Sequence, residues 1–312
     1  MKRILFILLG LGILFVPITA GATRTLTFEK WQITHEFQQQ NGPIVYGNTV
    51  VWADWRDLFG QAIDIWGYNF DTQEEFPIIT RPGDQRPEAI NRKYILYSDI
   101  PAPSESDVRL YNRETGEDFT IADGSDNQTA GGISGANIIY VVGSAVGDLY
   151  VYNLNHKEAK FITNNVSVPR ISGHKIVWYY GNSIHGYDLS KKDFFEITNG
   201  FASTPDIYQN NVVWRGSDGI FYKNLKTNSI KKIADQGSWP RISNKFITWV
   251  QDDGIGAHNI YAYDLKTGQT VQVSNDGPQQ PSPTIPSIWR DTIVWMSWHT
   301  GNGDVYAAKL HY

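Results

Sequence analysis

The chain has 312 residues, a formal net charge of −5 and no cysteine. The negative charge argues against a nucleic-acid partner, because phosphate binding needs a dense face of Lys and Arg. The lack of cysteine excludes disulfides, thiolate catalysis and cysteine zinc sites, so the fold depends on a core that a chain of this length can bury.

The N-terminal segment has the pattern of an export signal. Lys2 and Arg3 precede an apolar run at 4–20, and the sequence Ala20-Gly21-Ala22 has the A-x-A form of a cleavage site. We predict that residues 1–22 are a signal peptide and that the mature chain, 23–312, is extracellular, surface-held or periplasmic. The alternative is an uncleaved N-terminal anchor that contacts the membrane through 4–20.

The remainder of the chain is repetitive. An aromatic residue closes an apolar triplet at intervals of 35 to 46 residues. The positions are Trp52, Tyr97, Tyr140, Trp178, Trp214, Trp249 and Trp295. This period is typical of a four-stranded propeller blade, so we predict one all-β domain, 23–312, with seven antiparallel blades and these aromatics in its core.

Each repeat is predicted to contain four strands. A short first strand such as 169–172 carries Pro and Ile, and a second strand such as 175–180 is rich in β-branched and aromatic residues. The third strand, as at 259–265, often opens with Asp or Asn, which we expect to make a turn hydrogen bond. A tight turn leads to a fourth strand that ends in Ile-Thr or a variant, as at Thr198.

The last repeat lacks a fourth strand. It stops at Tyr312, whereas residues 25–34 have the ending of a fourth strand with no first three strands before them. We therefore predict that 25–34 pairs with 304–312, completes the last blade and closes the ring. Closure removes the open sheet edge that an unclosed array would expose.

The repeats resemble those of TolB-like β-propellers. The resemblance is carried by "DIWGYNFDTQEEFPIIT" at 64–80, "PRISGHKIVW" at 169–178 and "NIYAYDLKTGQTVQVS" at 259–274, and it covers almost the whole mature chain. It is closest to the surface-layer type of cell-surface repeat proteins. It implies the propeller fold and an interaction module without catalytic residues common to the family.

The candidate site lies in predicted loops. Connections from second to third strands, and from fourth strands to the next first strand, share one face of a propeller, where function is usually found. The predicted ligand-binding residues are Trp55, Arg56, Arg86, Arg170, Tyr180, Arg215, Trp239, Arg241, Asp252 and His299. Aromatics would stack on a ligand, Arg would donate hydrogen bonds and Asp252 would contact a cation or hydroxyl; packing of the loops themselves is the alternative.

The predicted function is binding rather than catalysis. The sequence has no G-x-S-x-G, H-E-x-x-H or phosphate-loop motif. We predict that the face around the central channel binds a protein or glycan of the cell envelope, without a cofactor. The alternatives are a carbohydrate-active lyase or hydrolase with a cation-assisted site at the channel mouth, and a structural tile of an envelope layer. Acid pairs at Asp54/Asp57 and Asp252/Asp253 could bind Ca²⁺.

Overall fold

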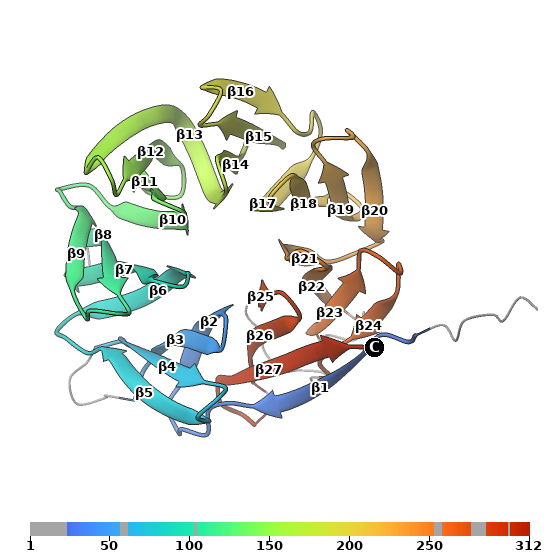
Figure 1. Cartoon of the computed structure of the whole chain (residues 1–312), viewed down its shortest axis with the longest axis horizontal. Helices are drawn as coiled ribbons and strands as arrows, with labels where there is room; N and C mark the ends of the chain where they lie inside the picture. Colours follow the sequence, from blue (N-terminus) through green and yellow to red (C-terminus); the bar gives the residue numbers. More distant parts are fainter. Residues whose placement is uncertain (1–23, 57–61, 103–104, 253–257, 276–284, 299) are drawn as a thin grey trace, which may run out of the picture.

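The computed structural model describes residues 24–312 except 57–61, 103–104, 253–257, 276–284 and 299. Across these residues the chain is all-β, and the sheets stand around a central axis like the blades of a propeller (Figure 1). The predicted fold class is confirmed. Among the residues described, none belongs to a helix long and apolar enough to cross a membrane.

The strands form five four-stranded sheets and one seven-stranded sheet, all antiparallel. Blade 1 contains β2 (Gln40–Tyr46), β3 (Thr49–Asp54), β4 (Asp64–Asn69) and β5 (Glu74–Ile79). Blade 2 contains β6 (Asp84–Ile90), β7 (Tyr94–Ala102), β8 (Glu105–Asn112) and β9 (Asp118–Ala122). Blade 3 contains β10 (Gln128–Ser134), β11 (Asn137–Gly143), β12 (Gly147–Asn153) and the first part of β13 (Glu158–Ser172).

The second part of β13 begins blade 4, which continues with β14 (Lys175–Tyr180), β15 (Ser183–Asp188) and β16 (Asp193–Glu196). Blade 5 contains β17 (Ala202–Tyr208), β18 (Asn211–Gly216), β19 (Gly219–Asn224) and β20 (Ile230–Ala234). Blade 6 contains β21 (Ser238–Ile242), β22 (Phe246–Asp252), β23 (His258–Asp264) and β24 (Thr270–Gln272). Blade 7 contains β25 (Ser287–Trp289), β26 (Thr292–Ser297), β27 (Asp304–His311) and β1 (Thr27–Gln32).

The junction of blades 3 and 4 differs from the prediction of two separate strands. The 15-residue β13 pairs with β12 up to Val166 and with β14 from Ser167 onward. Asn165 and Val168 have positive φ angles of 59° and 51°. These two residues redirect the chain from one sheet into the next without a loop, which explains why the two sheets are continuous.

The N-terminal strand closes the ring as predicted. β1 pairs antiparallel with β27, from Thr27 opposite His311 to Gln32 opposite Tyr306. The amide of Ile33 extends the ladder by donating to the carbonyl of Val305 at 2.7 Å. The first and last strands of the chain therefore lie side by side (Figure 1).

A repeated hydrogen bond shows that β1 takes the place of a fourth strand. In other blades, a Ser or Thr hydroxyl just after the fourth strand accepts a backbone amide of the third strand. Thr198 Oγ1 accepts the amide of Ile184 at 2.9 Å, and Ser274 Oγ accepts the amide of Ile260 at 2.9 Å. Thr34 Oγ1 accepts the amide of Val305 at the same distance. Residues far apart in sequence thus form the same end-of-blade contact as residues joined by a short turn.

The recurring Pro motif marks a β-bulge in the innermost strands. The residue before Pro has a positive φ in four blades, and the pairing register shifts there. The residues are Gly42 (59°), Val168 (51°), Thr204 (48°) and Trp239 (53°). A bulge re-aims the next side chains, and Pro, which lacks an amide hydrogen, fits in an edge strand.

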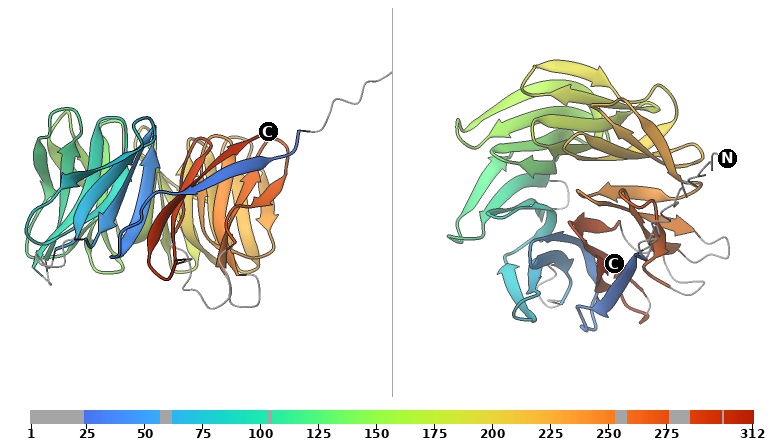
Figure 2. Two further views of the ribbon diagram at one scale, coloured as in Figure 1. Left: turned by 90° about the horizontal axis from the view of Figure 1, so that it is seen from below. Right: turned by 45° about the vertical axis from the view of Figure 1, so that its right-hand side comes forward.

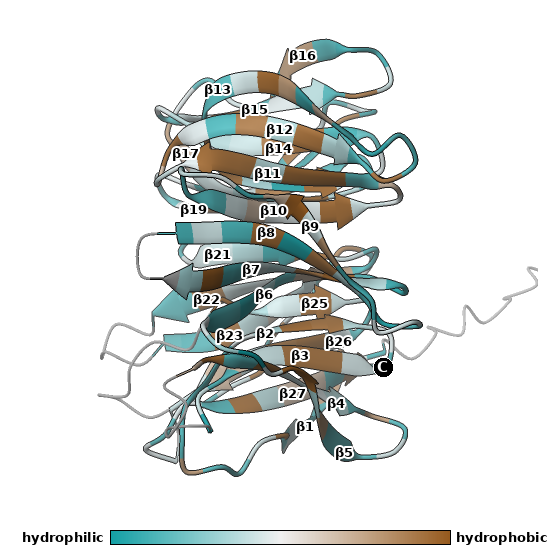
Figure 3. Ribbon diagram, turned by 90° about the vertical axis from the view of Figure 1, so that its left-hand side faces the viewer, coloured by the Kyte–Doolittle hydropathy of each residue, from teal (hydrophilic) through white to brown (hydrophobic). Residues whose placement is uncertain are grey.

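The repeated aromatics form the core, as predicted. All seven are buried, with at most 5% of their surface exposed. Five stack on the residue opposite them in the third strand, with centroid distances from 5.4 Å in Tyr140–Tyr150 to 6.0 Å in Trp295–Tyr306. The hydrophobic segments of strands such as β3 and β11 appear brown in Figure 3. The connections lie at the two ends of the strands (Figure 2).

Candidate ligand-binding site around the axis

The structure places most of the predicted site residues on strands. Arg86, Arg170, Arg215, Trp239 and Arg241 lie within strands. The prediction that they lie in loops is wrong, because the bulged first strands extend through the x-Pro step and because β18, a second strand, extends to Gly216 and includes Arg215. Tyr180 and Asp252 end strands β14 and β22, Trp55 and Arg56 lie in a connection, and His299 lies outside the described residues.

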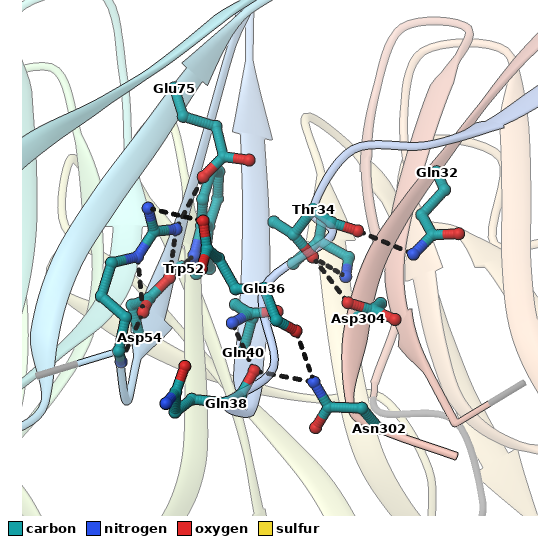
Figure 4. A network of polar contacts seen from close by, with 12 residues as sticks. Gln32, Thr34, Glu36, Gln38, Gln40, Trp52, Asp54, Glu75, Asn302 and Asp304 are labelled. Atoms are coloured by element: carbon teal, nitrogen blue, oxygen red, sulfur yellow. Dashed lines mark hydrogen bonds and ion pairs between the residues drawn. The ribbon is translucent and has the colours of Figure 1, made fainter. Parts of the chain in front are cut away.

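Arg56 is engaged by protein groups. Its Nε and Nη2 donate to Asp54 at 2.9 and 2.8 Å, and Nη2 also donates to Glu75 at 2.6 Å. Figure 4 labels these two carboxylates and marks the contacts as dashed lines. The guanidinium carbon lies 3.7 Å from the ring centroid of Trp66. Desolvation lowers the pKa of Arg56, but the hydrogen bonds to Asp54 and Glu75 outweigh it and hold the pKa above its ordinary value. Arg56 therefore stabilises blade 1.

Arg170 and Arg241 have a different environment. Arg170 Nη1 donates to the carbonyl of Pro169 at 2.9 Å, and Arg241 Nη1 donates to the carbonyl of Pro240 at 3.1 Å. Neither guanidinium forms an ion pair within the described part of the chain. Desolvation and the charge of Arg170 together lower the pKa of Arg241 to about 9, although the charge of Asp206 opposes them. Two partly desolvated cations thus lie near one another without a carboxylate bound to either.

Two acids that the sequence analysis missed belong to the same group. Although Glu88 is exposed on β6, the protein atoms around the axis desolvate it and raise its pKa to about 7, against the opposing charges of Arg170 and Arg86 and a hydrogen bond with Ser98. Asp206 raises the pKa of Arg241, and its Oδ2 accepts the amide of Ile242 at 2.9 Å. We call Glu88, Arg170, Asp206 and Arg241 the axial cluster.

The axial cluster surrounds the axis of the ring. Glu88 is on β6 of blade 2, Arg170 on β13 of blade 4 and Arg241 on β21 of blade 6. These blades are not neighbours, so their side chains can influence one another only where the innermost strands converge. All four residues directly follow the Pro of their strands. If the repeats are aligned on these Pro residues, the four residues of the axial cluster occupy the same position, and this shared position could have identified the cluster from the sequence.

The remaining predicted residues are more scattered. Arg86 is half exposed, with Nη2 at 3.4 Å from Asp84, and Trp239 precedes Pro240 on β21 with 36% of its surface exposed. Tyr180 lines a separate groove of about 520 Å³ with Asn164 and Phe194. Arg215 is exposed on β18. The structure thus brings Arg170 and Arg241 together but does not group all ten residues.

The predicted cation sites receive no support from the described residues. The Asp54 carboxylate accepts hydrogen bonds from Trp52 Nε1 and Arg56. Asp57 and Asp253 lie outside the described residues. Asp252 Oδ2 is 3.8 Å from Nε2 of His258, and its carbonyl accepts from Gln236. Within the described part, no group of three His, Asp or Glu residues is arranged to hold a metal ion.

No protein-family model and no curated protein matches the sequence. Solved structures are similar in fold. An oligogalacturonate lyase from Vibrio parahaemolyticus is 11% identical with a TM-score of 0.69, and the match covers 92% of this chain and 97% of that chain. The β-propeller domain of the Trilobed protease from Pyrococcus furiosus, described as having an open velcro topology, is 11% identical with a TM-score of 0.69. That match covers 88% of this chain and 93% of that chain.

TolB from Acinetobacter baumannii is also similar in fold, at 13% identity and a TM-score of 0.50, with 86% of this chain and 78% of that chain covered. At these identities the similarity supports a TolB-like propeller fold. The similar structures include a lyase and TolB, so the fold does not separate a binding function from an enzymatic one.

Proposed function

We propose that the chain is a non-catalytic binding propeller. Its partner is a protein or glycan of the cell envelope that presents a carboxylate or another anionic group to the axial cluster. The observation that carries this proposal is the pair of guanidiniums on Arg170 and Arg241, which influence one another across the axis and, within the described chain, form no ion pair with a carboxylate. The export pattern at 1–22 supports a location outside the cytoplasm.

The chemistry of the cluster suits an anion. A guanidinium offers several N–H donors in a fork that matches a carboxylate or phosphate. The charge of Arg170 disfavours the charged form of Arg241, and Asp206 opposes this effect. A bound anion relieves the repulsion between the two cations. Asp206 and Glu88 can accept hydroxyl hydrogens, and Trp239, next to Pro240, offers a partly exposed ring for stacking.

The experiment is a titration of the full chain with acidic oligosaccharides and acidic peptides at constant ionic strength. The double variant Arg170→Ala/Arg241→Ala should weaken binding about 100-fold, since a hydrogen bond to a charged group contributes about 1.5–3 kcal/mol. Arg92→Ala removes one charge from an exposed site and should change affinity little. Equal affinities of the double variant and the wild type would overturn the proposal.

A second candidate is a carbohydrate-active enzyme. It is favoured by Glu88, an exposed carboxyl group on the innermost strand β6 beside Arg170 and Arg86, where a pKa raised to about 7 suits a general base. Incubation with acidic polysaccharides would test for shortened or unsaturated products. Products formed by the wild type but not by Glu88→Gln would replace the binding assignment with an enzymatic one.

A further inference from the structure

A second cavity lies at the junction where the ring closes. It has a volume of about 680 Å³ and lies between blade 7 and blade 1. Its polar lining comes from the β2–β3 turn at Asn48, the β4–β5 turn at Asp71 and Gln73, and the β25–β26 turn at Asp291. These turns occupy the end of the strands opposite to the β3–β4 connection that carries Trp55. The cavity is therefore on the other face from the predicted loops.

Four aromatic rings form the apolar walls of this cavity, which we call the seam pocket. They are Trp31, Tyr68, Phe70 and Trp289. Phe70 makes edge contacts with Trp31 and Tyr68 at centroid distances of 5.7 and 5.6 Å, and Trp289 packs against Tyr46 at 5.3 Å. All four rings are partly buried. Their neighbours fix their orientation, while part of each ring remains accessible to a ligand.

Polar side chains surround the aromatic walls. Asn48 Nδ2 donates to Asp71 Oδ2 at 2.6 Å, and the amide of Asp71 donates to Asn69 Oδ1 at 2.8 Å, so the Asp71 carboxylate is held in place. Asp291 and Lys309 also line the pocket. The rim thus supplies acceptors from two carboxylates and donors from an amide and an ammonium group.

We propose that the seam pocket binds a sugar ring of a neutral glycan. A pyranose has apolar C–H faces that stack on aromatic rings and hydroxyls that both donate and accept at its edge, which matches the walls and the rim. Two carboxylates and one ammonium group line the pocket, and the Arg290 guanidinium lies 4.5 Å from the ring of Trp289, so the nearby charges balance and do not specifically attract an anionic ligand. A quaternary ammonium ion would leave the rim without hydrogen bonds and would be repelled by Lys309.

Ligand binding at this pocket would also affect ring closure. Trp31 belongs to β1, the strand that completes blade 7, whereas Tyr68 and Phe70 belong to blade 1. A ligand that contacts both blades binds the closed ring more tightly than a ring in which β1 has detached. By mass action it stabilises the closed state, so amides of β1 that donate to β27 should exchange more slowly when the ligand is bound.

The test uses the full chain and a panel of neutral cello-, xylo-, manno- and chito-oligosaccharides, with saturation-transfer NMR and titration as the readouts. At least one of these should bind. Asp71→Ala, on an exposed turn, and Trp289→Leu should each weaken it at least tenfold. Phe194→Leu alters an aromatic residue that is 53% exposed on β16 and should leave affinity unchanged. Each variant is first checked by its thermal unfolding curve.

Three outcomes would overturn the proposal: no binding by any member of the panel, binding that both pocket variants retain, or preferential binding of tetramethylammonium that Trp289→Leu abolishes. Arg170→Ala/Arg241→Ala should retain the neutral sugar while it loses the acidic ligand. This distinguishes failure of the seam pocket from failure of the axial site.

Discussion

Arg56 and the Arg170–Arg241 pair show two uses of arginine in one fold. Arg56 bonds two carboxylates and covers the ring of Trp66, whereas Arg170 and Arg241 donate hydrogen bonds to backbone carbonyl groups and to no carboxylate. All three were predicted to bind a ligand. The comparison indicates which arginines are candidates for ligand binding. An arginine whose guanidinium is paired with carboxylates of the protein has a structural role, whereas one without such a pair can bind an anionic ligand, whether or not it lies near a loop.

The largest expected effect comes from removing Arg56. In Arg56→Met the fully buried carboxylate of Asp54 loses its cation, which should lower the free energy of unfolding by about 3 kcal/mol in urea titrations. The matched variant Arg241→Met removes a desolvated cation next to another cation. Its stability should remain within about 1 kcal/mol of the wild type or rise. If both variants lost the same stability, the distinction between the two kinds of arginine would fail.

Glu88 gives a pH-dependent test of the axial cluster. Its folded pKa of about 7 lies above the ordinary 4.5, so between these values the folded chain binds more protons than the unfolded chain. The free energy of unfolding should therefore fall as pH rises through this window. Glu88→Gln should remove the contribution of this carboxyl group to the decrease in the free energy of unfolding, as measured by urea titrations at several pH values. An unchanged pH profile would contradict the assigned environment of Glu88.

The smallest expected effect on stability is at two aromatics that are only partly buried, Trp55 and Trp239. Trp55→Ala combined with Trp239→Ala should weaken an axial ligand while leaving the melting temperature nearly unchanged, because Trp239 is partly exposed and Trp55 lies in a connection. Thermal unfolding measures the melting temperature, and titration of the same sample with the ligand measures the affinity. A large drop in melting temperature would assign both residues to packing.

Sequence reasoning was most successful where the repeat constrains it. The seven aromatics and the Ile-Thr endings recur because each blade must pack on the next, so the fold and the pairing of 25–34 with the last strand could be predicted. The continuous β13 could not, because its redirection depends on positive φ angles at Asn165 and Val168. Asn is enriched at positive φ, but a β-branched residue such as Val168 rarely adopts it, so the sequence gives no signal for the pair.

The site was harder to predict for a related reason. Loops were expected to carry it, whereas the axial cluster lies on the innermost strands. Glu88 and Asp206 were missed because their proximity to Arg170 and Arg241 arises from the convergence of separate blades around the axis. The seam pocket was missed because Trp31 and Phe70 meet only after the ring closes.

The uninterrupted β13 has a mechanical consequence. At the junctions joined by a connecting segment, two neighbouring blades can shift slightly while that segment absorbs the change. Blades 3 and 4 instead share one strand whose ladder continues from β12 to β14. Because residues up to Val166 pair with β12 and those from Ser167 with β14, movement of one blade against the other has no connecting segment to absorb it and must change the backbone torsions between these pairings. We expect this pair to move as one body, with breathing motions of the ring concentrated at its other junctions.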